Sequence, residues 1–199
     1  MNFEIVLATN NKHKLQEVRK ILSPHKILVY CPNDLNLKVP EVEENGKTYY
    51  ENALIKAKAV ASVTSFPVIA DDSGLEIEAM DNKPGIHSAR YAESQGGHKE
   101  AFKEIFKNIE GKSRKARFVC NIVLLNVKNK PLVFEGIAEG EIADKPYGDD
   151  GFGYDPIFFS YDCQQTFAEI PEDIKNKVSH RGKALKKLIT FLKIDQLIK

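Results

Sequence analysis

The sequence has few cysteines, and they form no pattern that suggests a zinc site. Cys31, Cys120 and Cys163 are the only three, and they stand far apart in the 199 residues. None of the paired spacings typical of structural zinc is present. We therefore expect reduced thiols and a cytoplasmic protein.

Long apolar runs and an excess of one charge are also missing. No segment approaches the length needed to cross a membrane. Residues 1–8 lack the basic start and the long apolar stretch of a signal peptide. The 29 basic and 28 acidic residues leave a net charge of +1, which provides no general attraction to nucleic acid or to a membrane surface. We expect neither as a partner.

The sequence does contain alternating strand and helix patterns. With 199 residues and 42% hydrophobic content, it is long enough to bury one sizeable core, so we expect a single domain over 1–199. The predicted strands are 3–8, 27–31, 68–70, 75–77, 118–127, 132–142 and 157–159. The predicted helices are 12–22, one that begins after Thr48, 99–109 and one that Ser179 caps; 32–47, 84–91 and 145–155 are expected to be irregular.

The two longest predicted strands join around residues 129–130, which is typical of a hairpin. An antiparallel pair among strands that alternate with helices indicates a mixed sheet. The sequence therefore predicts the α/β class, with a mixed sheet flanked by helices.

The first strand, loop and helix offer a grip for phosphate. Thr9 carries a hydroxyl, Asn10 and Asn11 carry amides, and Lys14 lies in the first helical turn. Backbone N–H groups and the positive end of the dipole attract anions at such a helix start. The glycines and the Gly-Lys-Ser/Thr triplet of a Walker A loop are absent. An ordinary helix cap followed by a surface lysine is the alternative.

Two acidic pairs, Glu43-Glu44 and Asp71-Asp72, flank the second predicted helix. The aspartates follow a buried strand, at the sheet edge where ligands often bind. Carboxylate oxygens are the ligands that Mg²⁺ prefers, and one of them can orient or deprotonate water. We expect residues 73–74 to turn the chain sharply. A solvated acidic turn is the alternative, and it is slightly favoured for the glutamates.

Lys56 lies on an alanine-rich helix that Thr48 and Glu51 open with capping-box spacing. Its apolar neighbours suggest that its ammonium group lies at the edge of a site, where it would offset phosphate charge. The alternative is a simple surface lysine, as expected for Lys58.

Aromatic and glycine residues alternate over 151–155, and a polar cluster precedes the last helix. The faces of Phe152 and Tyr154 can stack on a base, and Asp155 can bind N–H groups on the base edge. His180 and Arg181 can donate to a phosphate or carbonyl oxygen. A turn with buried aromatics and a capped helix start are the alternatives.

In this order, the clusters resemble the noncanonical purine nucleoside triphosphate pyrophosphatases, the family of ITPase and XTP/dITP diphosphatase. The matching runs extend over nearly the whole chain, so the resemblance is specific as a set. They are Leu7-Ala8-Thr9-Asn10-Asn11 with Lys14, Glu51-Asn52-Ala53 with Lys56, 70–75, Pro84-Gly85, Ser88-Ala89-Arg90-Tyr91, 151–158 and Ser179-His180-Arg181-Gly182. Two features depart from the family: Asn10, where many members carry glycine, and the short segment after Tyr91.

The resemblance implies hydrolysis of ITP, dITP and XTP between the α- and β-phosphates. Metal-assisted attack by water would release the monophosphate and pyrophosphate, and so cleanse the nucleotide pool. The family also implies an elongated mixed sheet flanked by helices, two lobes with a central nucleotide cleft, and a homodimer.

Carried over by position, the resemblance implies a role for each cluster. Asp72 would bind Mg²⁺ and accept the proton of the attacking water, and Glu43 or Glu44 would be the second metal-side carboxylate. The residues implied to bind substrate are Thr9, Asn10, Asn11, Lys12, His13 and Lys14 at the phosphates, Lys56 and Ser73 at the nucleotide, and Phe152, Gly153, Tyr154, Asp155, Lys175, His180 and Arg181 around the base.

Selectivity would depend on the oxygen at C6 of hypoxanthine and xanthine. Donors such as His180 and Arg181 can hydrogen-bond to that oxygen. When adenine is bound, they would face its C6 amino group, which is itself a donor, and would be left without an acceptor. Guanine also carries the oxygen, so its exclusion needs another cause.

Three other functions compete with this reading. The runs 152–155 and 179–181 disfavour a septum-inhibitor-like pyrophosphatase that acts on other nucleotides. Asp71, Asp72 and Lys56 disfavour a binding module without catalysis. The basic stretch 99–117 would serve RNA binding, but the neutral chain favours a solvated helix face and charged loop there.

Overall fold

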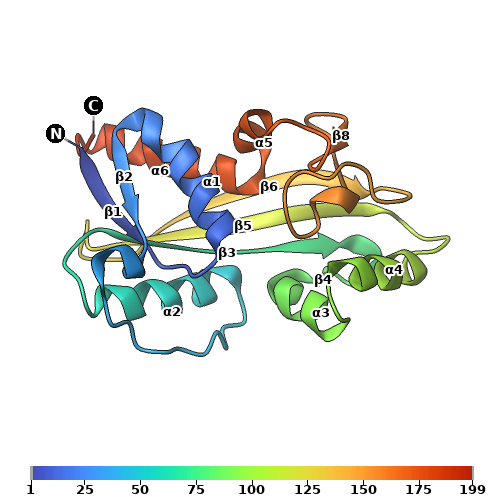
Figure 1. Cartoon of the computed structure of the whole chain (residues 1–199), viewed down its shortest axis with the longest axis horizontal. Helices are drawn as coiled ribbons and strands as arrows, with labels where there is room; N and C mark the ends of the chain where they lie inside the picture. The colour runs from blue at the N-terminus through green and yellow to red at the C-terminus, as the bar shows by residue number, and fades with distance from the viewer. Residues whose placement is uncertain (1, 199) are drawn as a thin grey trace. The chain divides into compact units, whose positions relative to one another are not determined.

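The computed structural model describes residues 2–198, and eight strands among them form a mixed sheet. The strand order is β2-β1-β3-β5-β6-β7-β8, with β4 paired to β3 (Figure 1). β1 runs parallel to β2 and β3, whereas the pairs β3–β4, β6–β7 and β7–β8 are antiparallel. The mixed α/β fold expected from the sequence is therefore confirmed. The strands are β1 (Phe3–Leu7), β2 (Ile27–Tyr30), β3 (Val68–Ile77), β4 (Lys83–Pro84), β5 (Lys115–Leu125), β6 (Leu132–Ile142), β7 (Phe158–Ser160) and β8 (Gln165–Thr166).

Six α-helices accompany the sheet within residues 2–198. They are α1 (Lys12–Leu22), α2 (Tyr49–Ala61), α3 (Ser88–Ser94), α4 (His98–Asn108), α5 (Glu172–Val178) and α6 (His180–Ile194). Short 3₁₀ segments lie at Ser23–His25, Pro32–Leu35, Glu78–Met80, Gly85–His87 and Asp155–Ile157. None of the helices in the described chain is long and apolar enough to cross a bilayer.

The chain divides into two compact units, each with its own hydrophobic core. The first contains the residues up to Asp72, Cys120–Gly136 and those from Gly182 on; the second contains Ser73–Val119 and Ile137–Arg181. The strands β3, β5 and β6 and the helix α6 each contribute residues to both units.

In the first unit, helices cover both faces of the strands. α1 and α6 lie on one face and α2 on the other (Figure 1). Val18 and Leu22 of α1 pack in one cluster with the apolar stripe of α6, while Ala53 and Ala57 of α2 pack in a second cluster. The stripe consists of Ala184, Leu185, Leu188, Ile189 and Leu192, as the helical spacing predicts.

The core of the second unit is rich in aromatic rings. The rings of Phe158 and Phe167 lie 5.0 Å apart, and the ring of Phe118 lies 4.7 Å from that of Phe158. Ile105 of α4 packs against the same cluster. Tilted and edge-on contacts at these separations are the arrangements that aromatic quadrupoles favour.

The sharp turn expected at residues 73–74 is wrong. β3 continues without interruption from Val68 to Ile77, so the two short strands predicted there are one. Gly74 serves close packing instead: a Cβ at this position would come within 2.0 Å of the carbonyl oxygen of Gly85. Consecutive residues of a strand point to opposite faces, which directs Asp71 and Asp72 to different helices.

Two further expectations are corrected. Residues 84–91, expected to be irregular, contain the end of β4, a 3₁₀ turn and the start of α3. The helix α5, which begins directly after Pro171, was not predicted. Both helices have only seven residues, which is too short for a clear helical period in the sequence.

Candidate functional site

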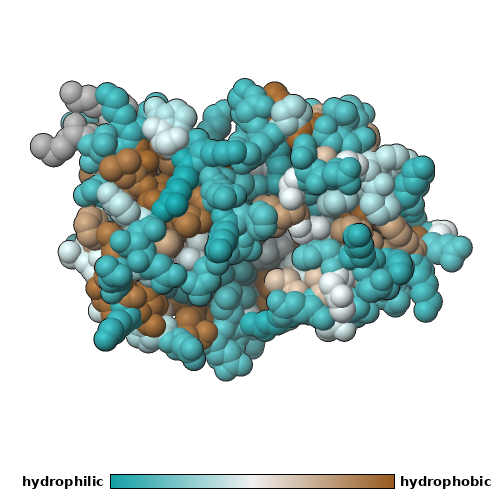
Figure 2. All heavy atoms as spheres, viewed as in Figure 1, coloured by the Kyte–Doolittle hydropathy of each residue, from teal (hydrophilic) through white to brown (hydrophobic). Residues whose placement is uncertain are grey.

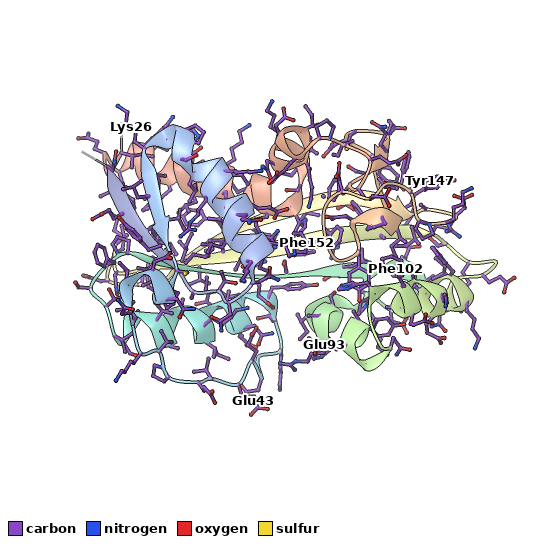
Figure 3. The ribbon with its side chains drawn as sticks, viewed as in Figure 1. Lys26, Glu43, Glu93, Phe102, Tyr147 and Phe152 are labelled. Carbon is purple, nitrogen blue, oxygen red and sulfur yellow. The ribbon has the colours of Figure 1, made fainter. Side chains whose placement is uncertain are left out.

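In the first unit, acidic side chains gather around a lysine of α2. The Nζ atom of Lys56 lies 3.2 Å from Asp72 Oδ1 and 2.8 Å from Glu44 Oε2. Of the two candidate glutamates, Glu44 therefore joins the cluster. Glu43 is exposed on the loop that precedes α2 (Figure 3).

Burial and charge act in opposite directions within this cluster. Burial raises the pKa of Asp72 and outweighs the opposing effect of Lys56 and Lys14. Burial also lowers the pKa of Lys56, but Asp72, Asp71 and Glu44 together leave that pKa raised. The cluster thus holds a persistent ammonium group beside a carboxylate that is a stronger base than an exposed aspartate.

Asn52 belongs to the same cluster, although it was not among the site residues predicted from the sequence. Its Nδ2 donates to Asp72 Oδ2 at 3.3 Å, and its Oδ1 accepts from the backbone N–H of Gly46 at 2.9 Å. The side chain therefore holds Asp72 and the end of the Glu44 loop together. Its position four residues before Lys56, on the same helix face, is the signal that would have identified it.

The start of α1 presents an exposed polar segment. Asn11 is the N-cap, and its Oδ1 accepts from the N–H groups of His13 and Lys14 at 3.0 and 3.1 Å. Asn10, Lys12 and His13 are exposed, and Thr9 is half-buried. Thr9 Oγ1 accepts from the N–H of Asn11 at 3.1 Å.

Lys14 points back toward β3. Its Nζ lies 3.0 Å from Oδ2 of the buried Asp71. Asp71 thus meets a lysine of α1, whereas its neighbour Asp72 meets a lysine of α2. The two consecutive carboxylates are each paired with a cation from a different face of the sheet.

The donor set of this unit fits a divalent ion of the magnesium type. Among residues 2–198, no group of three or more His, Cys, Asp and Glu side chains is arranged to enclose a metal. Glu44 and Asp72 nevertheless direct one oxygen each to the same nitrogen of Lys56. Mg²⁺ that arrives with phosphates needs only one or two protein carboxylates, because phosphate oxygens and waters complete its shell.

In the second unit, two cations lie close to the ring of Phe152. Lys175 Nζ lies 4.9 Å from the ring centroid and Arg181 Cζ lies 5.8 Å from it. Asp155 Oδ2 accepts from the N–H of Phe152 at 2.8 Å and from Lys175 Nζ at 2.6 Å. The turn is tight at Gly151, whose φ is +77° and where a Cβ would lie 2.3 Å from Asp155 Oδ2.

The remaining residues of the predicted base-binding set lie in the same unit, and Tyr154, His180 and Arg181 are buried there. Arg181 Nη2 donates to Ser73 Oγ at 3.1 Å. The ring of His180 stacks on that of Phe118, with centroids 4.6 Å apart. Tyr154 is only 4% exposed, and its hydroxyl donates to the carbonyl of Ser88 at 2.8 Å. Gly153, between Phe152 and Tyr154, is half-buried.

The predicted site residues thus form two sets, one in each unit. In the first, Lys56 contacts both Asp72 and Glu44; in the second, the ring of Phe152 contacts both Lys175 and Arg181. Asp72 is the last residue of its segment in the first unit, and Ser73 opens the second.

Comparisons with known proteins identify relatives over almost the whole chain. A model of the Ham1 family matches residues 5–191. The chain is 41% identical over 199 residues to a dITP/XTP pyrophosphatase of Clostridium perfringens, covering 96% of this chain and 97% of the relative. It is 45% identical over 192 residues to a dITP/XTP pyrophosphatase of Dictyoglomus thermophilum, covering 94% of this chain and 93% of that relative.

Solved structures agree with this result. The Ham1 protein of Staphylococcus aureus matches with a TM-score of 0.84 at 38% identity, over 96% of this chain and 99% of that one. A HAM1 protein of Coxiella burnetii matches with a TM-score of 0.83 at 41% identity, over 96% of this chain and 98% of that one.

Proposed function

The chain belongs to the Ham1 family, and from this premise we propose that it hydrolyses noncanonical purine nucleoside triphosphates. The substrates would be ITP, dITP and XTP, and the products the monophosphate and pyrophosphate. The relatives named dITP/XTP pyrophosphatase support this reaction. The observation that carries the proposal is the placement of Lys56 between Asp72 and Glu44, which combines a base, a cation and a second carboxylate.

We assign to Asp72 the proton of the attacking water. One of its oxygens is held by Lys56 and the other by Asn52, so the carboxylate has a fixed orientation. Because burial raises the pKa of Asp72, it accepts a proton more readily than an exposed aspartate. Lys56 offsets the negative charge of the phosphates in the transition state.

Mg²⁺ would be held by Glu44 and Asp72, whose oxygens suit a hard divalent ion. The bound ion would neutralise phosphate charge and polarise the phosphoryl group. The first turn of α1, with its exposed polar residues 10–13, would contact the phosphates.

The aromatic turn of the second unit would bind the base. Phe152 offers a ring for stacking, and the cations Lys175 and Arg181 polarise that ring. Donors from His180 and Arg181 favour the oxygen at C6 over the amino group of adenine.

A product assay tests the reaction. The protein, Mg²⁺ and a panel of triphosphates are incubated, and nucleotide and phosphate products are separated. Inosine monophosphate with pyrophosphate is expected, whereas release of orthophosphate would indicate an ordinary phosphatase and contradict the proposal.

The variant Asp72→Asn tests the role of the carboxylate. Without a proton acceptor, kcat for ITP is expected to fall about 10²- to 10⁴-fold. The far-UV circular dichroism and the melting temperature should stay near those of the wild type, because asparagine has the same shape and Lys56 keeps Glu44 as a partner. Near-normal turnover would refute this assignment.

We further propose a cytoplasmic homodimer. The first unit exposes several large apolar side chains, among them Leu28, Val133 and Ile194, and Figure 2 shows hydrophobic patches over this unit. The three free cysteines suit a reducing compartment. Light scattering coupled to size exclusion should give twice the 22.4 kDa mass of one chain; a monomer across the micromolar range would contradict the dimer.

A further inference from the structure

Ser88 lies at the centre of a hydrogen-bond network that the proposed reaction leaves without a role. Its Oγ accepts from the backbone N–H of Leu75 at 2.9 Å and donates to the carbonyl of Gly85 at 2.7 Å. Its own carbonyl accepts from the hydroxyl of Tyr154 at 2.8 Å. All these groups belong to the second unit, and Ser88 is only 6% exposed.

The network joins the two segments that carry base-side residues. Leu75 stands on β3, two positions after Ser73, and Tyr154 stands on the turn, two positions after Phe152. Arg181 bonds to Ser73 and lies over the ring of Phe152. Ser73 and Phe152 must therefore keep a constant separation if one arginine is to reach both.

The packing around Gly74 brings Ser88 close to β3. A Cβ at Gly74 would lie 2.0 Å from the Gly85 carbonyl oxygen and 2.8 Å from Ser88 Oγ. Only glycine permits this approach, and only a side chain as small as serine fits with its hydroxyl between Leu75 and Gly85. Because these groups are buried, loss of the hydroxyl would leave the N–H of Leu75 unpaired at a substantial cost.

Tyr154 is held at both ends of its side chain. Its ring lies 5.2 Å from that of His98 and 6.0 Å from that of Phe102, between centroids. Phe102 lies on α4, and Phe152 lies on the loop before Asp155 (Figure 3). Packing thus fixes the ring, and the bond to Ser88 fixes the hydroxyl.

We propose that Ser88 and Tyr154 are positioning residues that hold the base-binding turn 152–155 in register with β3. They set the affinity for the base through Phe152 and Arg181 and do not contact the nucleotide. For Tyr154, this replaces the role in base contact that the family resemblance implies. The inference depends on the proposed function for its kinetic consequences, but its structural consequence is independent of any substrate.

The experiment compares two variants that each lose a buried hydroxyl group with two variants that each lose an exposed hydroxyl group in the same unit. Tyr154→Phe removes the hydroxyl that bonds to Ser88, and Ser88→Ala removes the hydroxyl that bonds to Leu75. Tyr161→Phe and Ser94→Ala are the matched controls, because both hydroxyls are exposed: that of Tyr161 donates to Glu141, and that of Ser94 donates to the carbonyl of Tyr91 and accepts from the side chain of Gln95. KM and kcat are measured for ITP and ATP with each variant.

Both buried deletions should raise KM for ITP about tenfold, the lower part of the range for a buried partner left unsatisfied, and leave kcat within about twofold. The preference for ITP over ATP should fall, because the side chains that donate hydrogen bonds to the base are no longer held in fixed positions. Both controls should match the wild type. A fall in kcat at constant KM, or wild-type values for Tyr154→Phe, would overturn the inference.

Hydrogen exchange provides a readout without substrate. In Tyr154→Phe, backbone amides of 150–155 should exchange faster, while those of α2 keep their protection. Unchanged exchange in the turn overturns the inference even if no triphosphate is hydrolysed. If Ser88→Ala fails to fold, Tyr154→Phe alone decides the question, since it only removes an oxygen from a ring that remains packed.

Discussion

Lys56 and Lys58 stand two positions apart on α2 but have different surroundings. Lys56 is half-buried between Asp72 and Glu44, whereas Lys58 is exposed. From the sequence, Lys56 could be either a lysine at the edge of a phosphate site or a simple surface lysine, because residue type and spacing do not reveal which carboxylates a helix face contacts. The structure resolves this, since Asp72 comes from a strand 16 positions away.

The pair Lys56→Met and Lys58→Met tests this difference. Methionine keeps most of the side-chain length and removes the charge. We expect kcat/KM for ITP to fall about 100-fold or more in Lys56→Met, as for loss of a donor aimed at transition-state charge. Lys58→Met should retain wild-type kinetics. Equal effects of the two substitutions would show that Lys56 has no special role.

Glu43 and Glu44 form a second matched pair. Only Glu44 contacts Lys56, while Glu43 is exposed. We expect a chelator to abolish activity and Mg²⁺ to restore it. Glu44→Gln should require about tenfold more Mg²⁺ for half-maximal activity, the scale of effect seen when groups around a metal are altered. Glu43→Gln should need the same Mg²⁺ concentration as the wild type for half-maximal activity. If instead Glu43→Gln needed more Mg²⁺ and Glu44→Gln did not, Glu43 would be the ligand.

At the scale of the element, β3 and α1 show how local signals succeed and fail. The start of α1 at Lys12 was predicted correctly, and of the two candidate caps, Asn10 and Asn11, the structure has Asn11, whose side chain acts within one helical turn. The turn predicted at residues 73–74 was wrong, because glycine also serves close packing, and its contact with Gly85 depends on a segment that comes later in the chain. The sequence pattern cannot separate these two uses of glycine.

The cap of α1 allows stability and phosphate binding to be separated. Asn11→Ala removes the acceptor for two backbone N–H groups and should cost about 1 kcal/mol of unfolding free energy. Asn11→Asp retains an acceptor and should keep the stability, but its negative charge should raise KM for ITP. Urea titration and steady-state kinetics measure the two effects. A normal KM in Asn11→Asp would argue against phosphate binding at this helix start.

At the scale of the whole molecule, the stability of the fold should depend on the protonation of His98. His98 is exposed, but its ring packs against Tyr154 and Phe102; the resulting loss of hydration lowers the pKa of His98, and the charge of Asp155 opposes this effect. The folded state therefore favours the neutral ring. As the pH falls below the ordinary histidine pKa of about 6.5, the unfolded chain takes up the proton first, so stability decreases.

This dependence should be visible between about pH 7.5 and pH 5. The melting temperature of the wild type should fall as the pH is lowered through this window. His98→Gln should reduce the slope. The same slope in wild type and His98→Gln would exclude His98 as the responsible group.

The sequence alone determined the α/β class, most helix and strand positions and the residue types of the chemistry, because periodicity, caps and motifs act over short distances. Only the tertiary structure decided which of these residues meet: Glu44 in place of Glu43, Asn52 beside Asp72, and Tyr154 turned inward to Ser88. Such contacts join segments that are distant in the chain. Their geometry depends on the packing of a whole unit, which no local pattern encodes.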